Sequence, residues 1–565
     1  MIGSLEADAE ALIRTASAVY ADDPAVLESL DELDDRLREP LRLAIAGMVK
    51  AGKSTLLNAL LGERIAPTDA GECTRLITWY RYCATPTVTL HPHAGEPRRM
   101  PVRREEGRLL MDLGGVPAED IDWIEVGWPL EVLKSMILID TPGIASLSAD
   151  TSARATRFLT PESDTPSADA VVYLMRHLHA SDVRFLESFR DTAVGSARTV
   201  CAVGVLSRSD EIGAGRIDAL LSAAKVARRY ETDGELAALV LGIIPVAGLV
   251  AEGARTLRED EYDTFRRLAR LDRADREALL LSADRFVAQT DATTVSTAER
   301  AALLARFGIF GVRLATALIR GGVGDSSELA DAMVQQSGLV ELRQFVTTQF
   351  RSRSVALKVR GVLLALEKLL GDHPRDGVED IRAGLERLTT TAHELRELDT
   401  LATLRADDFS LAEADAADAR RILGGDGTTA TARLGLTEQA RDDEVRVSLD
   451  AALARWRTLV ESPLTQRGAI GVGQVVLRSL DAIATSGAVP SPAADTPAAA
   501  PPTPRSEVVA ADDSLVSAAD VDAPRGPGDA AGEDAAQQRQ EDEPRLGGKK
   551  KKKRLASVAK RHPLG

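Results

Sequence analysis

The sequence predicts an α/β domain with a doubly wound, mostly parallel sheet, followed by a long helical bundle and a C-terminal tail without folded structure. Three observations predict this order. Apolar strand-like runs alternate with helical segments up to about residue 250, strand signals end near residue 253, and residues 489–548 are rich in Ala, Pro, Asp and Glu. Alternating strands and helices are typical of a parallel sheet, and a chain of 565 residues is too long for one compact core.

The composition limits the classes of function. The chain has 70 basic and 86 acidic residues and a net charge of −16, whereas a general nucleic-acid binder needs a basic surface. The N-terminus lacks the basic and apolar regions of a signal peptide, and no run of about 18 uncharged apolar residues occurs. We therefore expect a cytoplasmic protein without a nucleic-acid partner, in which any membrane contact is peripheral.

The first elements along the chain are two predicted helices within residues 1–40. Apolar side chains recur there at helical spacing on both sides of a break at Asp23-Pro24. The short apolar run 41–46 follows and leads directly into a glycine-containing loop. A strand, a loop and a helix in this order are the context in which phosphate-binding loops occur.

The loop matches the phosphate-binding pattern Gly47-x4-Gly52-Lys53-Ser54 completely. The glycines let backbone N–H groups point at phosphates, Lys53 is expected to neutralise the β- and γ-phosphates, and the Ser54 hydroxyl is a candidate Mg²⁺ ligand. An ordinary glycine turn before a helix is the alternative. The predicted nucleotide-binding residues of this segment are Gly47, Lys50, Ala51, Gly52, Lys53, Ser54 and Thr55.

A second lysine, Lys50, lies inside the loop itself. From this position its ammonium can approach the β- and γ-phosphate oxygens, where negative charge develops during phosphoryl transfer. Lys50 and Lys53 are therefore candidate catalytic residues. The alternative for Lys50 is that it points to solvent or pairs with an acidic partner subunit.

Residues 76–140 contain β-branched and aromatic runs separated by Pro and Gly, which predicts several strands. The last run ends in Asp140 and continues as Thr-Pro-Gly143. We expect Asp140 to act on Mg²⁺ through water, and the Gly143 amide to reach the γ-phosphate because no side chain intervenes. The next residue is Ile144, so the glutamine that orients water in many small GTPases is absent.

If the loop belongs to a GTPase, a threonine between the loop and Asp140 is needed, which closes over Mg²⁺ and holds the attacking water. Thr74, in the glycine-bounded segment 72–75, is the candidate for this catalytic and metal-binding role. Thr68 is the fallback. A purely structural threonine in a turn is the alternative.

The segment Ser207-Arg208-Ser209-Asp210 ends another predicted strand and resembles the base-reading motif Asn/Thr-Lys-x-Asp. A carboxylate accepts two hydrogen bonds from the N1–H and the exocyclic amine of guanine, and adenine offers no such pair of donors. Asp210 therefore predicts GTP, with Arg208 packing over the base; an ATPase with a coincidental Asp210 is the alternative. Ala247 and Gly248, after the next strand, are expected beside the base through their backbone groups.

The rest of the chain shows helical patterns. They cover residues 262–288, 298–306 and 309–321, and then 338–371, 376–423, 436–461 and 466–486. A single helix of about 45 residues over 376–423 would span about 65 Å. Elements of this length predict a stalk of antiparallel helices.

Together, the segments 47–55, 72–75, 140–143 and 206–216 resemble those of the bacterial dynamin-like GTPases, most closely the actinobacterial isoniazid-inducible (Ini) group. The resemblance covers about residues 1–488. It implies a head that hydrolyses GTP to GDP with Mg²⁺, a helical stalk, self-association through the heads, and association with or remodelling of membranes. A GTP-dependent switch that docks a protein partner without remodelling lipid is the alternative.

These expectations divide the chain into five parts. They are N-terminal helices at 1–40 that pack on the stalk or neck, a GTPase domain at 41–323 with a helical insert at about 256–300, a helical bundle stalk at 324–488, an acidic linker at 489–548 and a polybasic tail at 549–565.

The tail carries eight basic and no acidic residues, and the linker carries twelve acidic and four basic residues. A basic residue close to an anionic membrane contributes about 1 kcal/mol to binding. The tail therefore favours an anionic membrane surface, which would place the protein at the inner face of the cell membrane. Nonspecific anion binding and pairing with the acidic linker are the alternatives.

Overall fold

The structure is a computed structural model that describes residues 2–67, 76–105, 107–143, 168–191, 201–232, 236, 239–404 and 411–485. The predicted acidic linker and polybasic tail lie outside the described residues. So do the predicted site residues Thr68, Thr74 and Ile144.

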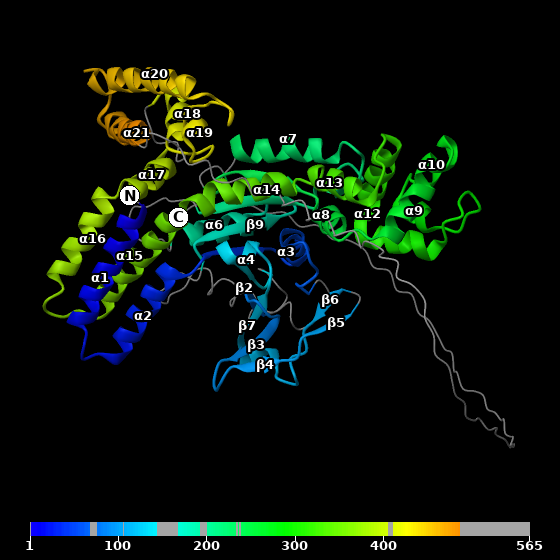
Figure 1. Ribbon diagram of the computed structural model, residues 1–565, viewed down its shortest axis with the longest axis horizontal. Coiled ribbons are helices and arrows are strands. Elements are labelled where there is room, and N and C mark those ends of the chain that lie inside the picture. Colours follow the sequence, from blue (N-terminus) through cyan, green and yellow to red (C-terminus); the bar gives the residue numbers. More distant parts are fainter. Residues whose placement is uncertain are drawn as a thin grey trace, which may run out of the picture. The chain divides into compact units, whose positions relative to one another are not determined.

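A nine-stranded sheet forms the centre of the α/β domain, in the order β11-β10-β9-β1-β8-β2-β7-β3-β4. Figure 1 labels its strands β9, β2, β7, β3 and β4. Five neighbouring strands run parallel. They are β11 (Ile243–Val246), β10 (Ala202–Ser207), β9 (Ala170–Met175), β1 (Leu41–Gly47) and β8 (Met136–Asp140). Every residue of β8, β9 and β10 is buried, as expected for parallel strands covered on both faces. The mostly parallel sheet predicted from the sequence is confirmed.

The sheet is doubly wound, because alternate side chains of β1 pack on opposite faces. Leu43 and Ile45 share a core cluster with residues of α3, whereas Ala44 and Ala46 share another with residues of α6 and α7. The helices of this domain are α3 (Lys53–Leu61), α4 (Val132–Ser135), α6 (Ala180–Asp191), α7 (Ala219–Thr232) and α8 (Gly248–Arg255), with 3₁₀ turns at Ala118–Asp120 and Ser209–Glu211.

Beyond β8 the sheet becomes mixed. β2 (Ile77–Tyr82) pairs antiparallel with β8 and parallel with β7 (Ile121–Trp128), and β3 (Thr87–Pro92) pairs antiparallel with β7. These strands match the β-branched and aromatic runs between residues 76 and 140, so that prediction is confirmed.

Three short strands were not predicted. They are β4 (Arg98–Met100), which pairs with β3, and β5 (Arg103–Glu105) and β6 (Arg108–Leu110), which form a separate two-stranded sheet. Each has only three residues, too few to show an alternation of apolar and polar residues.

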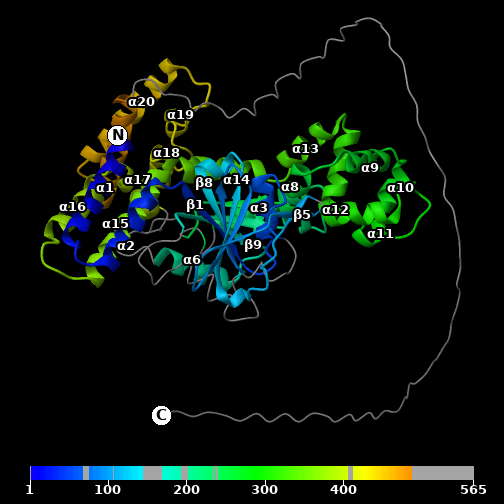
Figure 2. The same ribbon diagram turned by 60° about the horizontal axis from the view of Figure 1, so that its bottom comes forward.

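A group of short helices gathers around the long helix α12 (Figure 2). The helices are α9 (Glu259–Ala269), α10 (Arg273–Leu279), α11 (Ala283–Val287), α12 (Thr297–Arg320) and α13 (Ser326–Gln335). The helical character expected over 262–288 is confirmed, and it is divided among α9, α10 and α11. Asp272 and Ser282 each accept a hydrogen bond from a backbone N–H three residues on, and these N-caps start new helices within that segment.

Helix α12 is kinked at Gly308, where φ is 64° and ψ is 173°, a backbone region that is essentially restricted to glycine. The two helical segments expected on either side of this position are therefore halves of one kinked helix. Among the described residues, α12 is the one helix long and apolar enough to cross a membrane. Its Phe307 packs edge-to-face on Phe265 with ring centroids 5.1 Å apart, as in the core of a globular domain.

The remaining described chain is helical. α14 (Leu339–Phe345) continues through a π-helical turn at Val346–Phe350 and a 3₁₀ turn at Arg351–Arg353 into α15 (Ser354–Asp372). Further along lie α16 (Glu379–Thr391), α17 (His393–Thr403), α18 (Glu413–Ile422), α19 (Ala430–Arg433), α20 (Asp442–Glu461) and α21 (Arg467–Thr485). The predicted helical character is confirmed, and no strand is described after β11.

The expected helix of about 45 residues over 376–423 is wrong. The described part of this segment is divided into α16, α17 and α18, and α16 ends at Thr391, before Ala392, whose ψ of 112° is extended. Three threonines precede the break, and each hydroxyl donates to the carbonyl four residues earlier. β-Branched residues and hydroxyls that bond back to carbonyls weaken a helix, which accounts for a break without Gly or Pro.

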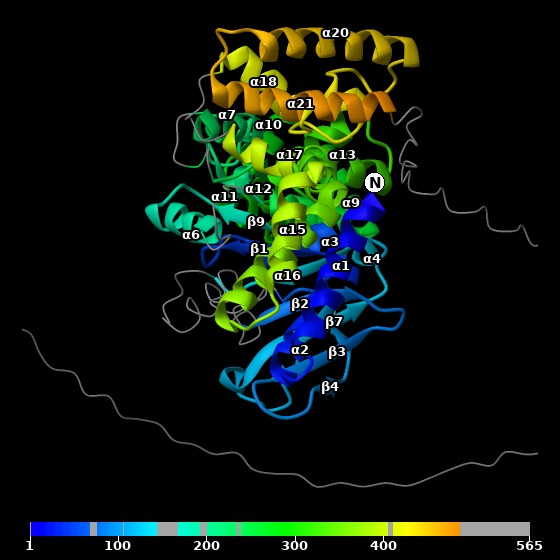
Figure 3. The same cartoon turned by 90° about the vertical axis from the view of Figure 1, so that its left-hand side faces the viewer.

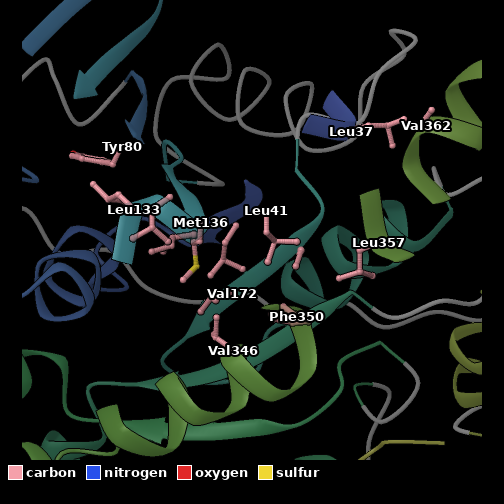
Figure 4. Packing of buried hydrophobic residues seen from close by; sticks show 14 of the residues in the cluster. Leu37, Leu41, Tyr80, Leu133, Met136, Val172, Val346, Phe350, Leu357 and Val362 are labelled. Atoms are coloured by element: carbon pink, nitrogen blue, oxygen red, sulfur yellow. The ribbon is translucent and has the colours of Figure 1, made fainter. Parts of the chain in front are cut away.

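The N-terminal helices α1 (Ile2–Val19) and α2 (Pro24–Arg38) pack against α15 and α16 (Figure 3). The Tyr20 hydroxyl donates to the His373 carbonyl at 2.6 Å, and Lys358 donates to the Glu39 carbonyl at 3.1 Å. A buried cluster continues from Met136 and Val172 in the sheet to Phe350 after α14 (Figure 4). The same core thus supports the sheet and the helices that follow it.

Candidate nucleotide-binding site

The loop between β1 and α3 lies at the carboxyl end of the parallel strands. Gly47 has a φ of 145°, and a Cβ there would lie 2.3 Å from the Leu174 carbonyl oxygen, so β1 can pass β9 only with glycine. Gly52, with a φ of 94°, is the N-cap of α3 and provides no side-chain cap. The N-terminal amides of α3 are therefore open to an anion.

Lys53 lies across this loop. Its Nζ donates to the carbonyls of Gly47 at 3.2 Å and Met48 at 3.3 Å. Burial lowers the pKa of Lys53, and the nearby Asp140 carboxylate acts in the opposite direction. A cation held over the phosphate loop by weak contacts to carbonyls can be transferred to phosphate oxygens.

Ser54 contacts Asp140 directly. The Ser54 hydroxyl donates to Oδ2 of Asp140 at 2.9 Å, and the carboxylate is 9% exposed. Burial raises the pKa of Asp140 to about 6, although Lys53 and Ser54 both lower it. Among the described residues, Oδ1 of Asp140 has no hydrogen-bond partner. A hydroxyl and a buried carboxylate with a free oxygen fit Mg²⁺, which prefers oxygen ligands.

Gly143 lies against the phosphate loop. The Thr141 hydroxyl donates to the Ile45 carbonyl at 2.9 Å, which fixes the segment after β8 beside β1. A Cβ at Gly143 would lie 2.8 Å from Cα of Val49, so any side chain at this position would push the two segments apart. The structure therefore brings Gly143 and the phosphate loop together.

A pocket joins the phosphate loop to the predicted base-reading segment. Asp210 lines this pocket and is 8% exposed, and burial raises its pKa to about 6. The lining residues are Ala51, Gly52, Thr55, Leu56, Leu174, Val205, Ser207, Arg208, Asp210, Glu211, Val246, Gly248 and Leu249. Predicted phosphate-binding and base-binding residues therefore border one space.

The base-reading segment is fixed by its own serines. The Ser207 hydroxyl donates to the Met175 carbonyl at 3.1 Å, and the Ser209 hydroxyl donates to the Leu206 carbonyl at 2.7 Å. The hydroxyl of Ser207 is thus engaged with β9. Ala247, predicted beside the base, is fully buried and is not among the lining residues.

Arg208 has a left-handed backbone with a φ of 52°, and its guanidinium donates to Glu211 at 2.8 Å. Arg176 donates to the other oxygen of Glu211 at 2.6 Å. Burial alone would raise the pKa of Glu211, but the two arginines hold it below its ordinary value. Arg208 therefore borders the pocket as one partner of an ion-pair cluster.

Lys50 is exposed and has a left-handed backbone with a φ of 63°. Within the described part of the chain, its ammonium has no hydrogen-bond or ion-pair partner. This arrangement matches the solvent-pointing alternative, and the catalytic role of Lys50 stays a prediction.

The sequence-based prediction missed the contribution of α12 to this site. A Cβ at Gly308, the kink of α12, would lie 3.7 Å from Oδ2 of Asp210. The glycine between two helical patterns was the available signal. It indicated a break in the helix, but not which residue lies against the break.

A sequence model of the Dynamin family matches residues 43–192, which include the phosphate loop, Asp140 and Gly143. The isoniazid-induced protein IniC of Mycobacterium tuberculosis is 41% identical over 455 residues, which cover 80% of this chain and 92% of that protein. The chain belongs to the IniC group of bacterial dynamin-like proteins. As a dynamin-like GTPase it hydrolyses GTP, so the predicted family, fold and enzyme class are confirmed.

More distant dynamin-like proteins match shorter stretches. A bacterial dynamin-like protein of Nostoc punctiforme is 33% identical over 123 residues, 19% of this chain and 17% of that protein. IniA of M. tuberculosis is 32% identical over 145 residues, 25% of this chain and 22% of that protein. Among solved structures, the match to a chain from an oligomerised bacterial dynamin pair extends over 85% of this chain and 75% of that chain, at 12% identity and a TM-score of 0.33.

Proposed function

We propose that this dynamin-like GTPase binds GTP with Mg²⁺ in the site described above and couples hydrolysis to association with, or remodelling of, an anionic membrane. The observation that carries the nucleotide part is the 2.9 Å contact between Ser54 and Asp140, whose other oxygen has no hydrogen-bond partner among the described residues. It supports a metal site next to the phosphate loop.

In this proposal Ser54 ligates Mg²⁺ directly, Asp140 acts through water, and Thr74 joins them from outside the described residues. Bound Mg²⁺ supplies positive charge to the β- and γ-phosphates. Lys53 leaves its carbonyl contacts for the same phosphates, and the amides at the start of α3 donate to them. The short distance between Gly143 and the loop supports a role for its amide at the γ-phosphate.

Asp210 then reads the base from the other end of the pocket, by accepting hydrogen bonds from the N1–H and the 2-amino group of guanine. The test is Asp210→Asn. The new amide would accept from N1–H and donate to the 2-oxygen of xanthine, so we expect preference to shift from GTP to xanthosine triphosphate. An unchanged preference for GTP would exclude this role.

The membrane part has two supports. The tail 549–565 carries eight basic and no acidic residues, and Leu464, in the turn between α20 and α21, is 92% exposed. Cations near an anionic surface and an exposed apolar side chain both favour membrane contact. In this proposal residues 41–323 are the GTPase head, and the helices of residues 324–488 transmit its nucleotide state to the membrane. The protein is then peripheral at the inner face of the cell membrane.

Co-sedimentation with liposomes tests this part. The full chain and a chain ending at residue 548 are compared in GTP and GDP, on anionic and on neutral vesicles. We expect binding to anionic vesicles that weakens without the tail. No binding to anionic vesicles in either nucleotide would support instead a switch that docks a protein partner.

Self-association through the heads is the last part of the proposal. GTPase activity per molecule is measured against protein concentration, with and without vesicles. A steep rise is expected if two heads complete one another's sites. Activity that is independent of concentration would exclude this assembly.

A further inference from the structure

The backbone that follows Asp210 is held in an unusual conformation. Gly213, Ala214 and Gly215 have φ values of 64°, 59° and 68°, so three consecutive residues are left-handed. Glycine adopts such angles easily, but alanine does so at a cost in free energy. A conformation of this kind persists only when neighbouring groups hold it.

Arg313 on α12 supplies those contacts. Its Nη1 donates to the carbonyls of Ala214 at 3.0 Å and Gly215 at 2.6 Å. Its Nε donates to the Leu280 carbonyl at 2.9 Å, and its Nη2 donates to the Leu281 carbonyl at 2.8 Å. One rigid guanidinium thus joins the left-handed turn to the chain that follows α10, through four carbonyl acceptors.

The same helix also contacts the turn and Asp210 through two earlier residues. A Cβ at Gly215 would lie 3.0 Å from Cγ2 of Ile309, and Ile309 and Arg313 share one face of α12 because they are four residues apart. Gly308, at the kink, lies beside the Asp210 carboxylate. Helix α12 therefore supports both the carboxylate and the turn that follows it.

We propose that Arg313 is a positioning residue for guanine recognition: by holding residues 213–215, it keeps the Asp210 carboxylate aligned with both hydrogen-bond donors of the base. This inference rests on the proposed base-reading role of Asp210. A carboxylate that contacts two donors at once needs a defined orientation. If the segment rotates, one of the two contacts is lost while the other can be kept.

The experiment compares GDP with inosine diphosphate, which lacks the 2-amino group of guanine. The ratio of the two affinities measures the contact to that group, whereas a general loss of structure lowers both affinities alike. Wild type should prefer GDP about tenfold or more, since a hydrogen bond to a charged group has about this effect. Arg313→Ala should bring the ratio close to one, with the affinity for inosine diphosphate changed by less than about threefold.

Arg320→Ala is the matched control. Arg320 is an exposed arginine at the end of the same helix, and this variant should keep the wild-type ratio. If Arg313→Ala does not fold, Arg313→Lys replaces it. A single ammonium cannot reach all four carbonyls, so an intermediate ratio is expected.

Two results would overturn the inference. One is a wild-type ratio in the folded Arg313 variant, and the other is an equal loss of affinity for both nucleotides. A wild type that does not distinguish the two nucleotides would instead contradict the base-reading role of Asp210, and this inference with it.

Discussion

Arg36 on α2 forms an ion pair with Asp169, just before β9, and the two side chains are only 3% and 4% exposed. Oδ2 of Asp169 also accepts the backbone N–H of Arg42, at the start of β1, at 2.7 Å. One carboxylate therefore connects the N-terminal helices to the neighbouring strands β1 and β9. Such a pair contributes mainly by compensating charges that would otherwise be buried alone.

Asp169→Asn should lower the free energy of unfolding by about 3 kcal/mol, because it removes the closer counter-ion of the buried Arg36 guanidinium and leaves only Glu39, 3.8 Å away. Urea denaturation measures the change. The control is Glu277→Gln, which breaks an exposed pair with Arg273, at 2.8 Å, and should cost less than about 0.5 kcal/mol. An equal change in the free energy of unfolding for the two variants would show that the buried pair stabilises the fold no more than an exposed pair does.

Nucleotide affinity should depend on the protonation of Asp210. Burial raises the pKa of this carboxyl to about 6, and only the ionised form accepts both hydrogen bonds from guanine. Affinity for GDP should thus be nearly constant above about pH 7 and fall about tenfold between pH 7 and pH 5. Titrations with a fluorescent GDP analogue measure this change.

Asp210→Asn is the control for this dependence, because an amide does not titrate in this range. Both proteins share any effect of phosphate protonation, so the ratio of their affinities isolates the carboxyl. A ratio that does not change between pH 5 and pH 8 would contradict the assignment.

The parts of the site that the sequence predicted are those built from neighbouring residues. The glycine loop, Asp140 with Gly143, and Asp210 each follow an apolar strand, and parallel strands bring their carboxyl ends to one edge of the sheet. The contacts of Gly308 and Arg313 with the base-reading segment join residues about 100 positions apart in the chain. Only tertiary packing creates them.

The errors in the helices have a more local cause. The break at Ala392 depends on the three threonine hydroxyls and not on a Gly or Pro signal. Strands β4 to β6 are too short for their pattern to differ from that of a loop. Local sequence determines where a helix can end, but packing selects among the permitted positions.

A buried carboxylate also sets a pH dependence among the helices after α15. Glu397 accepts from Arg433 at 2.5 and 3.0 Å and from Ser479 at 2.6 Å, and His393 lies 3.4 Å away. Burial alone would raise the pKa of Glu397, but hydrogen bonds from His393, Arg433 and Ser479 and the charge of Arg433 lower it to about 2. The contacts of the folded state therefore stabilise the ionised form of the Glu397 carboxyl relative to the unfolded state.

The sign of the effect follows from this depressed pKa. The stabilisation is complete above the ordinary pKa of a glutamate, about 4.5, and is lost as pH falls toward about 2. At pH 7, Glu397→Gln should lower the free energy of unfolding by about 3 kcal/mol. Urea denaturation at pH 7 and pH 4 should show a smaller difference from wild type at pH 4. A difference that does not change with pH would assign the loss to packing alone.

Lys50 provides the sharpest test of catalysis, because Ile144 stands where many small GTPases have a glutamine. We expect Lys50→Ala to retain GTP affinity within about threefold and to lower kcat about 100-fold, the usual loss when one group that stabilises transition-state charge is removed. Single-turnover hydrolysis and nucleotide titration separate the two quantities. Lys134→Ala is the control, since Lys134 is a half-exposed lysine of the same domain that pairs with Glu131.

A second variant separates the charge of Lys50 from its backbone. Its φ of 63° is strained for lysine or alanine but not for glycine, so Lys50→Gly removes the ammonium and relieves the strain. If the charge is what matters, the glycine and alanine variants hydrolyse GTP equally slowly. If the glycine variant keeps wild-type kcat, or if affinity and kcat fall together, Lys50 is a residue of the loop without a catalytic role, and the positive charge must come from elsewhere.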